Sequence, residues 1–405
     1  MHKIWLISVF VVLSGLVIGQ DNGWENPLSD KQIMRLIDKS KPSKSKILPA
    51  DIKNRLVVAT AFGQYSLTQD PIVIEEAKKL NELGYTAIKL SFGKVNGNQE
   101  GYNFHSDWKL TKEMSLRDMA THPYYKEVLN MPFKTIVLNI NDGYAGAARE
   151  DQTETLDTIE HEFYDLTKYL LREYRNRDVS FILTMQYGDS ALRGGAGEKV
   201  QWKKGTTPPD ISFRVKNMID WLNARQKGVN RARNEMGRTI CKVFNAAEVN
   251  KLFDGIDGIP SITTSVLPKT KLDMISWAAS EGKSDDGLKM FKAIDFIRQK
   301  FVPTDYMNGK KVVILGDIGE AENMNNQTHE SIRDFWDVLM GVSTVQNITY
   351  VFLKGLYCNE TKDGSAVQDK NRNADELKGY WLIKPDGTKS WTQEYFDEVF
   401  SKGKK

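Results

Sequence analysis

Short runs of β-branched and apolar residues alternate with longer amphipathic stretches from Arg55 onward, and this alternation strongly constrains the fold. Polar or turn residues bound each run, as is typical of buried parallel strands. The expected strands are residues 56–60, 87–90, 135–138, 179–183, 240–244, 272–276, 311–315 and 348–353. Eight strands of this kind require helices to connect them.

The intervening stretches have the period of helices. Leu156, Ile159, Phe163, Leu166 and Leu170 recur at spacings of three and four residues, which places them on one helix face. Similar patterns predict helices over residues 72–83, 115–129, 211–236, 287–301 and 331–340. Glycines at positions 84 and 237 stand where helix C-caps are expected.

Eight strand–helix alternations predict an α/β fold, a (β/α)8 barrel. An open doubly wound sheet is the competing architecture, but it usually has fewer strands, and no Gly-x-Gly-x-x-Gly turn follows the first strand. We expect one barrel domain over residues 55–378. A C-terminal extension, residues 379–405, is expected to pack on the barrel.

The N-terminus has the pattern of a secretory signal. His2 and Lys3 precede an apolar run over residues 4–18, and we expect cleavage after Gly19. The run is shorter than the roughly 20 residues that span a membrane, so no membrane span is expected in the mature protein. Residues 20–54 are polar and Lys/Ser-rich, with a helix expected over 30–38 and a solvated linker over 39–46.

Secretion makes the cysteines and sequons informative. Cys241 and Cys358 are the two cysteines, so the chain is not a disulfide scaffold. Because one precedes the fifth strand's centre and the other follows the eighth strand, we expect them at opposite barrel ends and free. Three glycosylation sequons begin at Asn326, Asn347 and Asn359.

Charge and motifs exclude several function classes. The net charge of +3, from 56 basic and 53 acidic residues, gives no reason to expect a nucleic-acid partner. The five histidines are scattered, and zincin, Walker A and Gly-x-Ser-x-Gly motifs are absent from the sequence. We therefore predict neither a metal nor a cofactor. The sequence leaves the oligomeric state open.

In a (β/α)8 barrel, functional residues follow the C-terminal ends of the strands. Carboxylates, amides and aromatic side chains dominate these positions, and such a set favours a neutral polyhydroxylated ligand, since aromatic rings stack on sugar faces. Carbohydrate is therefore the expected partner. The candidates are Tyr187, Asp189, Arg193, Asn245, Glu248, Trp277, Asp317 and Tyr357, with Glu320 and Glu322 expected as solvated loop charges.

These residues lie in segments that resemble the secreted, cellulase-like (β/α)8 glycoside hydrolases. The resemblance covers most of the chain from about Leu56. Its segments are Phe181-Ile182-Leu183, Gly188-Asp189, Arg193-Gly194, residues 221–229, Arg231-Ala232-Arg233, Ala247-Glu248-Val249-Asn250, Gly316-Asp317-Ile318-Gly319, residues 356–360 and Gly379-Tyr380-Trp381-Leu382-Ile383.

The resemblance implies two catalytic carboxylates, an acid/base after the fourth strand and a nucleophile after the seventh. Both positions differ from the family pattern. Where the family has Asn-Trp-Glu-Gly-Asp, this chain has Met-Gln-Tyr187-Gly-Asp189, and Gly-Glu-Phe-Gly becomes Gly316-Asp317-Ile318-Gly319. Tyrosine, with an ordinary pKa near 10, is a poor acid at neutral pH. Asp317 retracts its oxygens by roughly an ångström, and such a misplacement lowers rates by about 10²-fold.

Three hypotheses stay open. The first is a secreted barrel that engages carbohydrate with hydrolysis weakened or lost. The second is an active glycoside hydrolase using Asp317 with Glu248 or Asp189 as the relocated acid. The third is a secreted structural or matrix protein without a ligand. Tyr187 and Trp277 are candidates for stacking on sugar, and Arg193 for pairing with Asp189 or Asp317.

Overall fold

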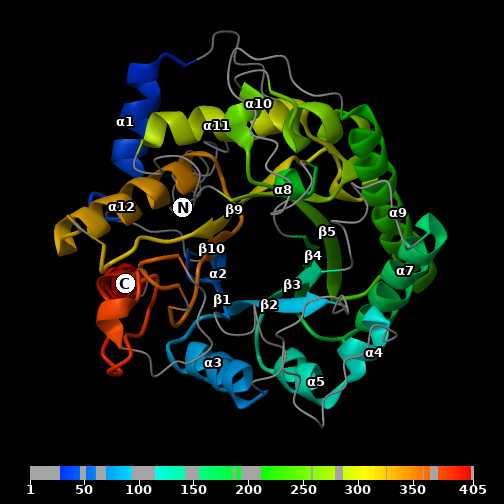
Figure 1. Ribbon diagram of the computed structural model, residues 1–405, viewed down its shortest axis with the longest axis horizontal. Helices are drawn as coiled ribbons and strands as arrows, with labels where there is room; N and C mark the ends of the chain where they lie inside the picture. Colours follow the sequence, from blue (N-terminus) through cyan, green and yellow to red (C-terminus); the bar gives the residue numbers. More distant parts are fainter. Residues whose placement is uncertain are drawn as a thin grey trace, which may run out of the picture.

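Eight parallel strands close into a barrel, with helices arranged around it (Figure 1). The computed structural model describes residues 28–45, 52–60, 70–93, 115–141, 155–185, 188–192, 211–256, 259–278, 286–324, 326–358, 360–364 and 373–402. The strands, in their order around the barrel, are β1 (Leu56–Ala59), β10 (Val351–Leu353), β9 (Val312–Ile318), β7 (Met274–Ala278), β5 (Lys242–Val249), β4 (Ser180–Thr184), β3 (Thr135–Asn141) and β2 (Ala87–Gly93). The predicted (β/α)8 barrel is confirmed.

The amphipathic stretches form the surrounding helices. One expected helix, over 115–129, is divided in two at His122, because Pro123 occupies the first turn of the second helix and cannot continue the first. The helices are α2 (Ile52–Arg55), α3 (Asp70–Glu82), α4 (Leu116–Thr121), α5 (Pro123–Asn130), α7 (Leu156–Glu173), α8 (Gly188–Leu192), α9 (Ser212–Met236), α10 (Leu252–Ile256), α11 (Gly287–Lys300) and α12 (His329–Val345).

The sixth expected strand is interrupted at Asp273. A short strand, β6 (Lys271–Leu272), precedes this residue and pairs with β8 (Val302–Pro303) in a separate two-stranded sheet. The barrel strand β7 begins at Met274 and pairs with β5 and β9. Asp273 therefore lies where the chain enters the barrel.

The eight barrel strands each contribute one side chain to an apolar cluster inside the barrel. We call this set the apolar layer. Since side chains alternate between the two faces of a strand, the residues between them, such as Val58 and Ile88, join the main core beneath the helices. The layer comprises Val57, Ala87, Val137, Ile182, Ala246, Met274, Ile314 and Phe352.

The N-terminal segment is anchored to the barrel through α1 (Asp30–Ser40), whose N-cap is Ser29. Ile37 is buried against α12, where a side chain at Gly341 would lie 2.8 Å from the Ile37 carbonyl oxygen. Ser43 then donates its backbone N–H to Asp337 at 2.8 Å. The segment over residues 39–46 was expected to be a solvated linker. Its described part, up to Ser45, is instead bound to α12 through Asp337.

The C-terminal segment ends in α13 (Trp391–Lys402), which packs beside α12 (Figure 1). Phe396 packs on Trp336, and Tyr85 donates a hydrogen bond of 3.0 Å to Gln393.

Glu322 corrects the expectation of a solvated loop charge. It is buried and accepts hydrogen bonds from the backbone N–H of Trp391 at 3.0 Å and the indole of Trp381 at 3.3 Å. Its other oxygen pairs with Lys384 at 2.5 Å. Glu322 therefore ties the loop after β9 to the C-terminal segment, whereas Glu320 accepts from Gln327 and stays half-exposed.

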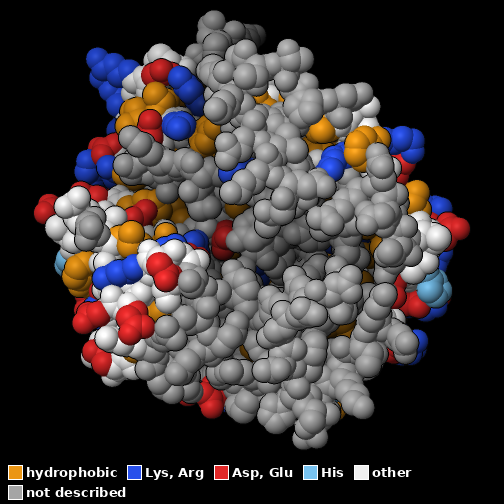
Figure 2. Space-filling model, in the orientation of Figure 1, with side chains coloured by type: hydrophobic (Ala, Val, Ile, Leu, Met, Phe, Trp, Pro, Cys, Tyr) orange, Lys and Arg blue, Asp and Glu red, His pale blue; other side chains and the backbone are white. Residues whose placement is uncertain are grey.

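Acidic and basic side chains are interspersed over the outer elements (Figure 2). Among the helices of the described residues, none is both long and apolar enough to cross a membrane.

Candidate functional site

A polar layer follows the apolar layer along the strands. It is formed on six of the strands, β2, β3, β4, β5, β7 and β9, by the residues two positions further toward the C-terminal ends, which alternation directs into the barrel. This end of the barrel, where the strands terminate, is called the mouth below. Apart from Gly316, the members are polar, and all are buried: Lys89, Asn139, Thr184, Glu248, Ser276 and Gly316.

Gly316 allows β9 to approach β7 closely in this layer. A Cβ atom at this position would lie 2.4 Å from the Oγ of Ser276, which is shorter than real contacts. The close approach immediately precedes Asp317, the next residue of β9.

Asp317 has a left-handed backbone at the mouth. Its φ is 53°, a region that residues other than glycine seldom adopt. The register between β9 and β10 shifts at the same place, from Leu315 opposite Val351 to Ile318 opposite Leu353. Asp317 is half-buried. Residues held in sparsely populated backbone regions cluster at functional sites, and this one carries a carboxylate to a barrel mouth.

Lys354 follows β10 and forms the electrostatic partner of this carboxylate. Its ammonium lies 3.0 Å from Glu360 and 3.8 Å from the ring centroid of Tyr380, and Lys378 pairs with the other oxygen of Glu360 at 3.2 Å. Burial would lower the Lys354 pKa, but the carboxylates of Glu360 and Asp317 outweigh it and raise the pKa above its usual value. Lys354 therefore stays charged beside Asp317.

Glu248 lies inside the barrel near the end of β5, in register with Ser276 of β7. It is 1% exposed. Because all eight strands are parallel, Glu248 and Asp317 lie at the same barrel end, as the sequence predicted. β5 and β9 therefore each bring one carboxylate to this end of the barrel.

Asp189, the other expected acid, is fully buried and bonded to backbone. One oxygen accepts from the N–H groups of Asn250 at 2.8 Å and Lys251 at 3.0 Å, and the second accepts from Ile262 at 2.7 Å. A carboxylate with these bonds holds the loops after β4, β5 and α10 together. Its geometry supports a structural role.

Asn245 and Trp277 lie on the outer face of the barrel, which corrects their expected place in the mouth. Asn245 directly precedes the inward-facing Ala246, and Trp277 directly follows the inward-facing Ser276. Because side chains alternate along a strand, both point outward. Trp277 is 1% exposed and packs edge-on against Phe253, with ring centroids 6.0 Å apart. Asn245 donates to Gln226 of α9 at 3.1 Å. Neither side chain can stack on or bind a ligand at the mouth.

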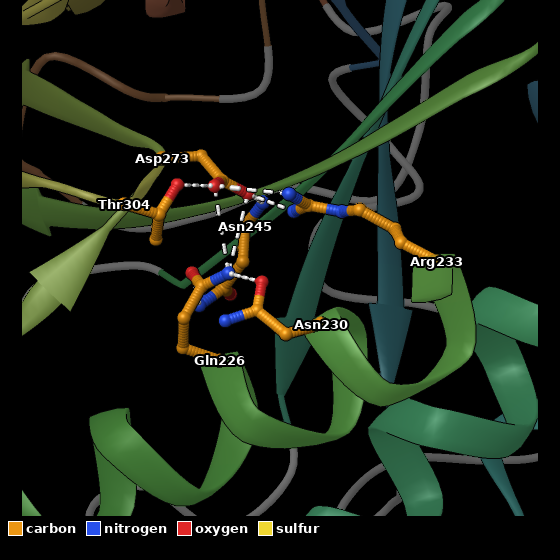
Figure 3. Close-up of polar contacts among 6 residues, drawn as sticks. All are labelled: Gln226, Asn230, Arg233, Asn245, Asp273 and Thr304. Atoms are coloured by element: carbon orange, nitrogen blue, oxygen red, sulfur yellow. Dashed lines mark hydrogen bonds and ion pairs between the residues drawn. The ribbon is translucent and has the colours of Figure 1, made fainter. Parts of the chain in front are cut away.

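Asn245 belongs to a buried polar cluster centred on Asp273 (Figure 3). Asp273 accepts from the backbone N–H of Asn245 at 2.8 Å and from the hydroxyl of Thr304 at 2.5 Å. It also forms a two-pronged ion pair with Arg233 of α9. Both charged groups are more than nine-tenths buried. This cluster joins α9 to the point where the chain enters β7.

The remaining candidates have different outcomes. Tyr187, Arg193 and Asn359 lie outside the described residues. Tyr357 is half-buried beyond β10 and packs against the main core. Cys241 and Cys358 are both buried and free, and burial raises the pKa of the Cys241 thiol to about 12. Within the described ranges, no three His, Cys, Asp or Glu side chains are placed to hold a metal ion.

Two lysines were missed in the sequence: Lys354 at the mouth and Lys89 inside the barrel below it. Lys89 did leave a signal, since it is the one charged residue in the run Ala87-Ile88-Lys89-Leu90. A charged side chain in a strand buried on both faces points into a polar interior or to a partner. Lys354 follows its strand immediately, where only the three-dimensional register reveals the approach to Asp317.

No model of a known protein family matches the sequence, and a comparison with curated proteins finds no match. Solved structures do resemble the fold. They include a Bacteroidetes-affiliated GH5 cellulase (9% identity, TM-score 0.49, covering 87% of this chain and 92% of that one) and a glycoside hydrolase family 5 enzyme from Prevotella bryantii B14 (9%, 0.45, 76% and 90%). A β-glucuronidase from Bacteroides uniformis is also similar (10%, 0.46), with 85% of this chain spanning 34% of that one. The likeness is one of fold.

Proposed function

We propose that the protein is a secreted, glycoside-hydrolase-like barrel that binds an oligosaccharide or polysaccharide at its mouth, with hydrolysis weakened or lost. The observation that carries this proposal is Asp317, a carboxylate in a left-handed backbone conformation at the C-terminal end of β9. Its position is that of the nucleophile in the family that the sequence resembles. A strained polar residue there favours a retained ligand site over a purely structural barrel.

Weakened hydrolysis follows from the side chains themselves. Cleavage of a glycosidic bond needs an acid that protonates the leaving oxygen and a carboxylate on the other side of the bond. Tyr187 stands in the sequence where the acid is expected, and Asp317 is one methylene shorter than glutamate. Sugar binding does not depend on a strong acid and a full-length carboxylate at these two positions, whereas cleavage of the glycosidic bond needs both groups in place.

Glu248 favours a second candidate, an active glycoside hydrolase. It is a buried, inward-facing carboxylate at the same barrel end as Asp317. In this alternative Glu248 protonates the leaving group and Asp317 acts opposite it. Asp189 is the less suitable acid, because three backbone N–H groups bind its oxygens.

The two candidates are separated by restoring and removing carboxylates. We expect Tyr187→Glu with Asp317→Glu to create or raise hydrolysis of a β-linked glycan, by more than the product of the single changes, since both groups act on one transition state. Carbohydrate binding should change little. Glycan binding and hydrolysis are measured in parallel on a polysaccharide panel. Robust wild-type hydrolysis that Glu248→Gln abolishes would establish the second candidate instead.

A further inference from the structure

Lys89 places a cation inside the barrel. It lies two residues after Ala87 of the apolar layer, while its neighbours Ile88 and Leu90 pack outward in the main core. Its ammonium lies 5.7 Å from the ring centroid of Phe352, another member of the apolar layer. Lys89 is 6% exposed. The side chain is therefore directed into the barrel from β2, below the mouth.

The ammonium of Lys89 has no hydrogen bond or ion pair within the part of the chain that the structure describes. A cation–π contact close to its limit of about 6 Å contributes little, so the ammonium stays available to an anion. Lys354 provides the contrast, since it has Glu360 at 3.0 Å. The charge of Lys354 is therefore neutralised within the protein, whereas that of Lys89 is free to bind a ligand.

A second unpaired donor lies in the same layer. The Oγ of Ser276, on β7, is buried and has no hydrogen-bond partner among the described residues. β2 and β7 are on opposite sides of the barrel. An ammonium and a hydroxyl on facing walls match a ligand that carries anionic and hydroxyl oxygens together.

We propose that Lys89 binds an acidic group, a carboxylate or a sulfate, on the carbohydrate that enters the mouth. This inference rests on the proposed function and narrows its substrate class from neutral to anionic glycans. Lysine suits the task because its ammonium acts as a point charge toward either kind of oxyanion. The anionic group is expected beside Phe352, away from the carboxylate of Glu248 on β5.

The test compares matched acidic and neutral oligosaccharides by titration calorimetry at physiological salt. One pair is a uronate oligosaccharide and its carboxyl-reduced form, and the other is a sulfated galactan oligosaccharide and its desulfated form. We expect the wild type to bind the acidic member of one pair at least 10-fold more tightly, the gain that one charge-assisted hydrogen bond gives. The pair that shows the preference identifies carboxylate or sulfate.

Lys89→Met keeps the length of the side chain and removes the charge, so it should abolish the preference for the acidic oligosaccharide. Lys269→Met, an exposed change at the opposite end of the barrel, controls for general surface charge and should keep the preference. We expect Lys89→Met to melt no lower than the wild type, since the change removes no hydrogen bond or ion pair of the ammonium among the described residues. Should it fail to fold, Lys89→Gln and the wild-type comparison decide.

Equal wild-type binding of acidic and neutral members would overturn the role of Lys89 and leave carbohydrate binding intact. A preference that survives Lys89→Met would do the same. Binding of no glycan in either pair or in the polysaccharide panel would overturn the proposed function and this inference with it.

Discussion

Asp317 combines a left-handed backbone conformation with a carboxylate at the mouth. A left-handed conformation costs a residue with a Cβ atom roughly 1 kcal/mol more than it costs glycine. Asp317→Gly and Asp317→Ala both remove the carboxylate, so the loss of the Lys354 interaction cancels between them. We therefore expect the glycine variant to exceed the alanine variant in free energy of unfolding by about 1 kcal/mol. Urea denaturation measures this difference.

Both variants should lose glycan binding relative to the wild type if Asp317 is a site residue. A glycine variant that is more stable than the wild type and no longer binds would show that the strain is maintained for the site. Unchanged binding in both would place Asp317 outside it.

The Lys354–Glu360 pair predicts a pH dependence. Burial opposes ionisation of Glu360, but Lys354 and Lys378 more than compensate and lower its pKa, while the Lys354 pKa is raised. A lowered acid pKa gives stability that is lost as pH falls through it, and a raised lysine pKa gives stability that is lost as pH rises through it. The contribution is therefore complete between about pH 5 and pH 10.

Lys354→Met retains the packing of the stem and should lower the free energy of unfolding by about 1 to 3 kcal/mol at pH 7. The difference from wild type should shrink below about pH 4, where Glu360 becomes protonated. Urea titrations at several pH values measure it. Lys389→Met, which breaks the exposed pair with Asp397, is the control and should cost about 0.5 kcal/mol or less at any pH. A pH-independent difference would contradict the role of Glu360.

At the level of elements, the sequence predicted which segments form strands better than which face each residue occupies. The run of β-branched residues located β5 and β7, yet Asn245 and Trp277 lie on the outer face. Parallel barrel strands are buried on both sides, so their hydrophobic pattern does not alternate and gives no face. The expected helix over 115–129 was divided because Pro123 imposes a boundary. The register between strands, which places Lys354 near Asp317, is fixed only when the barrel closes, so it could not be predicted from the sequence.

The buried cluster around Asp273 predicts a large stability effect at the junction of α9 and β7. Asp273→Ala leaves the Arg233 guanidinium buried without its carboxylate, and removing one partner of a buried pair costs about 3 to 5 kcal/mol. The loss should appear in urea denaturation. Asp305→Ala, which removes a 98% exposed partner of Lys271, should change stability by less than about 0.5 kcal/mol. Similar losses in the two variants would contradict the structural importance of the cluster.

At the scale of the whole molecule, both terminal segments pack on the same helix. α1 and α13 each contact α12, and β1 pairs with β10, so the barrel closes between its first and last strands. Such pairing between distant segments slows folding, because the entropy of closing a long loop must be lost first. Glu322, which ties the loop after β9 to Trp391, supports the last segment next to the mouth. The two terminal segments therefore pack against the outside of the barrel through α12.

The proposed secretion predicts where glycans attach to this folded surface. Asn326 and Asn347 are exposed in turns, with φ of 70° and 47°, so both are accessible. When the full chain is expressed in a eukaryotic secretory host, we expect it in the medium, beginning at Gln20 and glycosylated at both positions. Mass spectrometry with and without glycosidase measures this. Asn326→Gln and Asn347→Gln should each remove one glycan, whereas Asn308→Gln, at an exposed asparagine outside a sequon, should remove none. A chain retained inside the cell without glycans would contradict secretion.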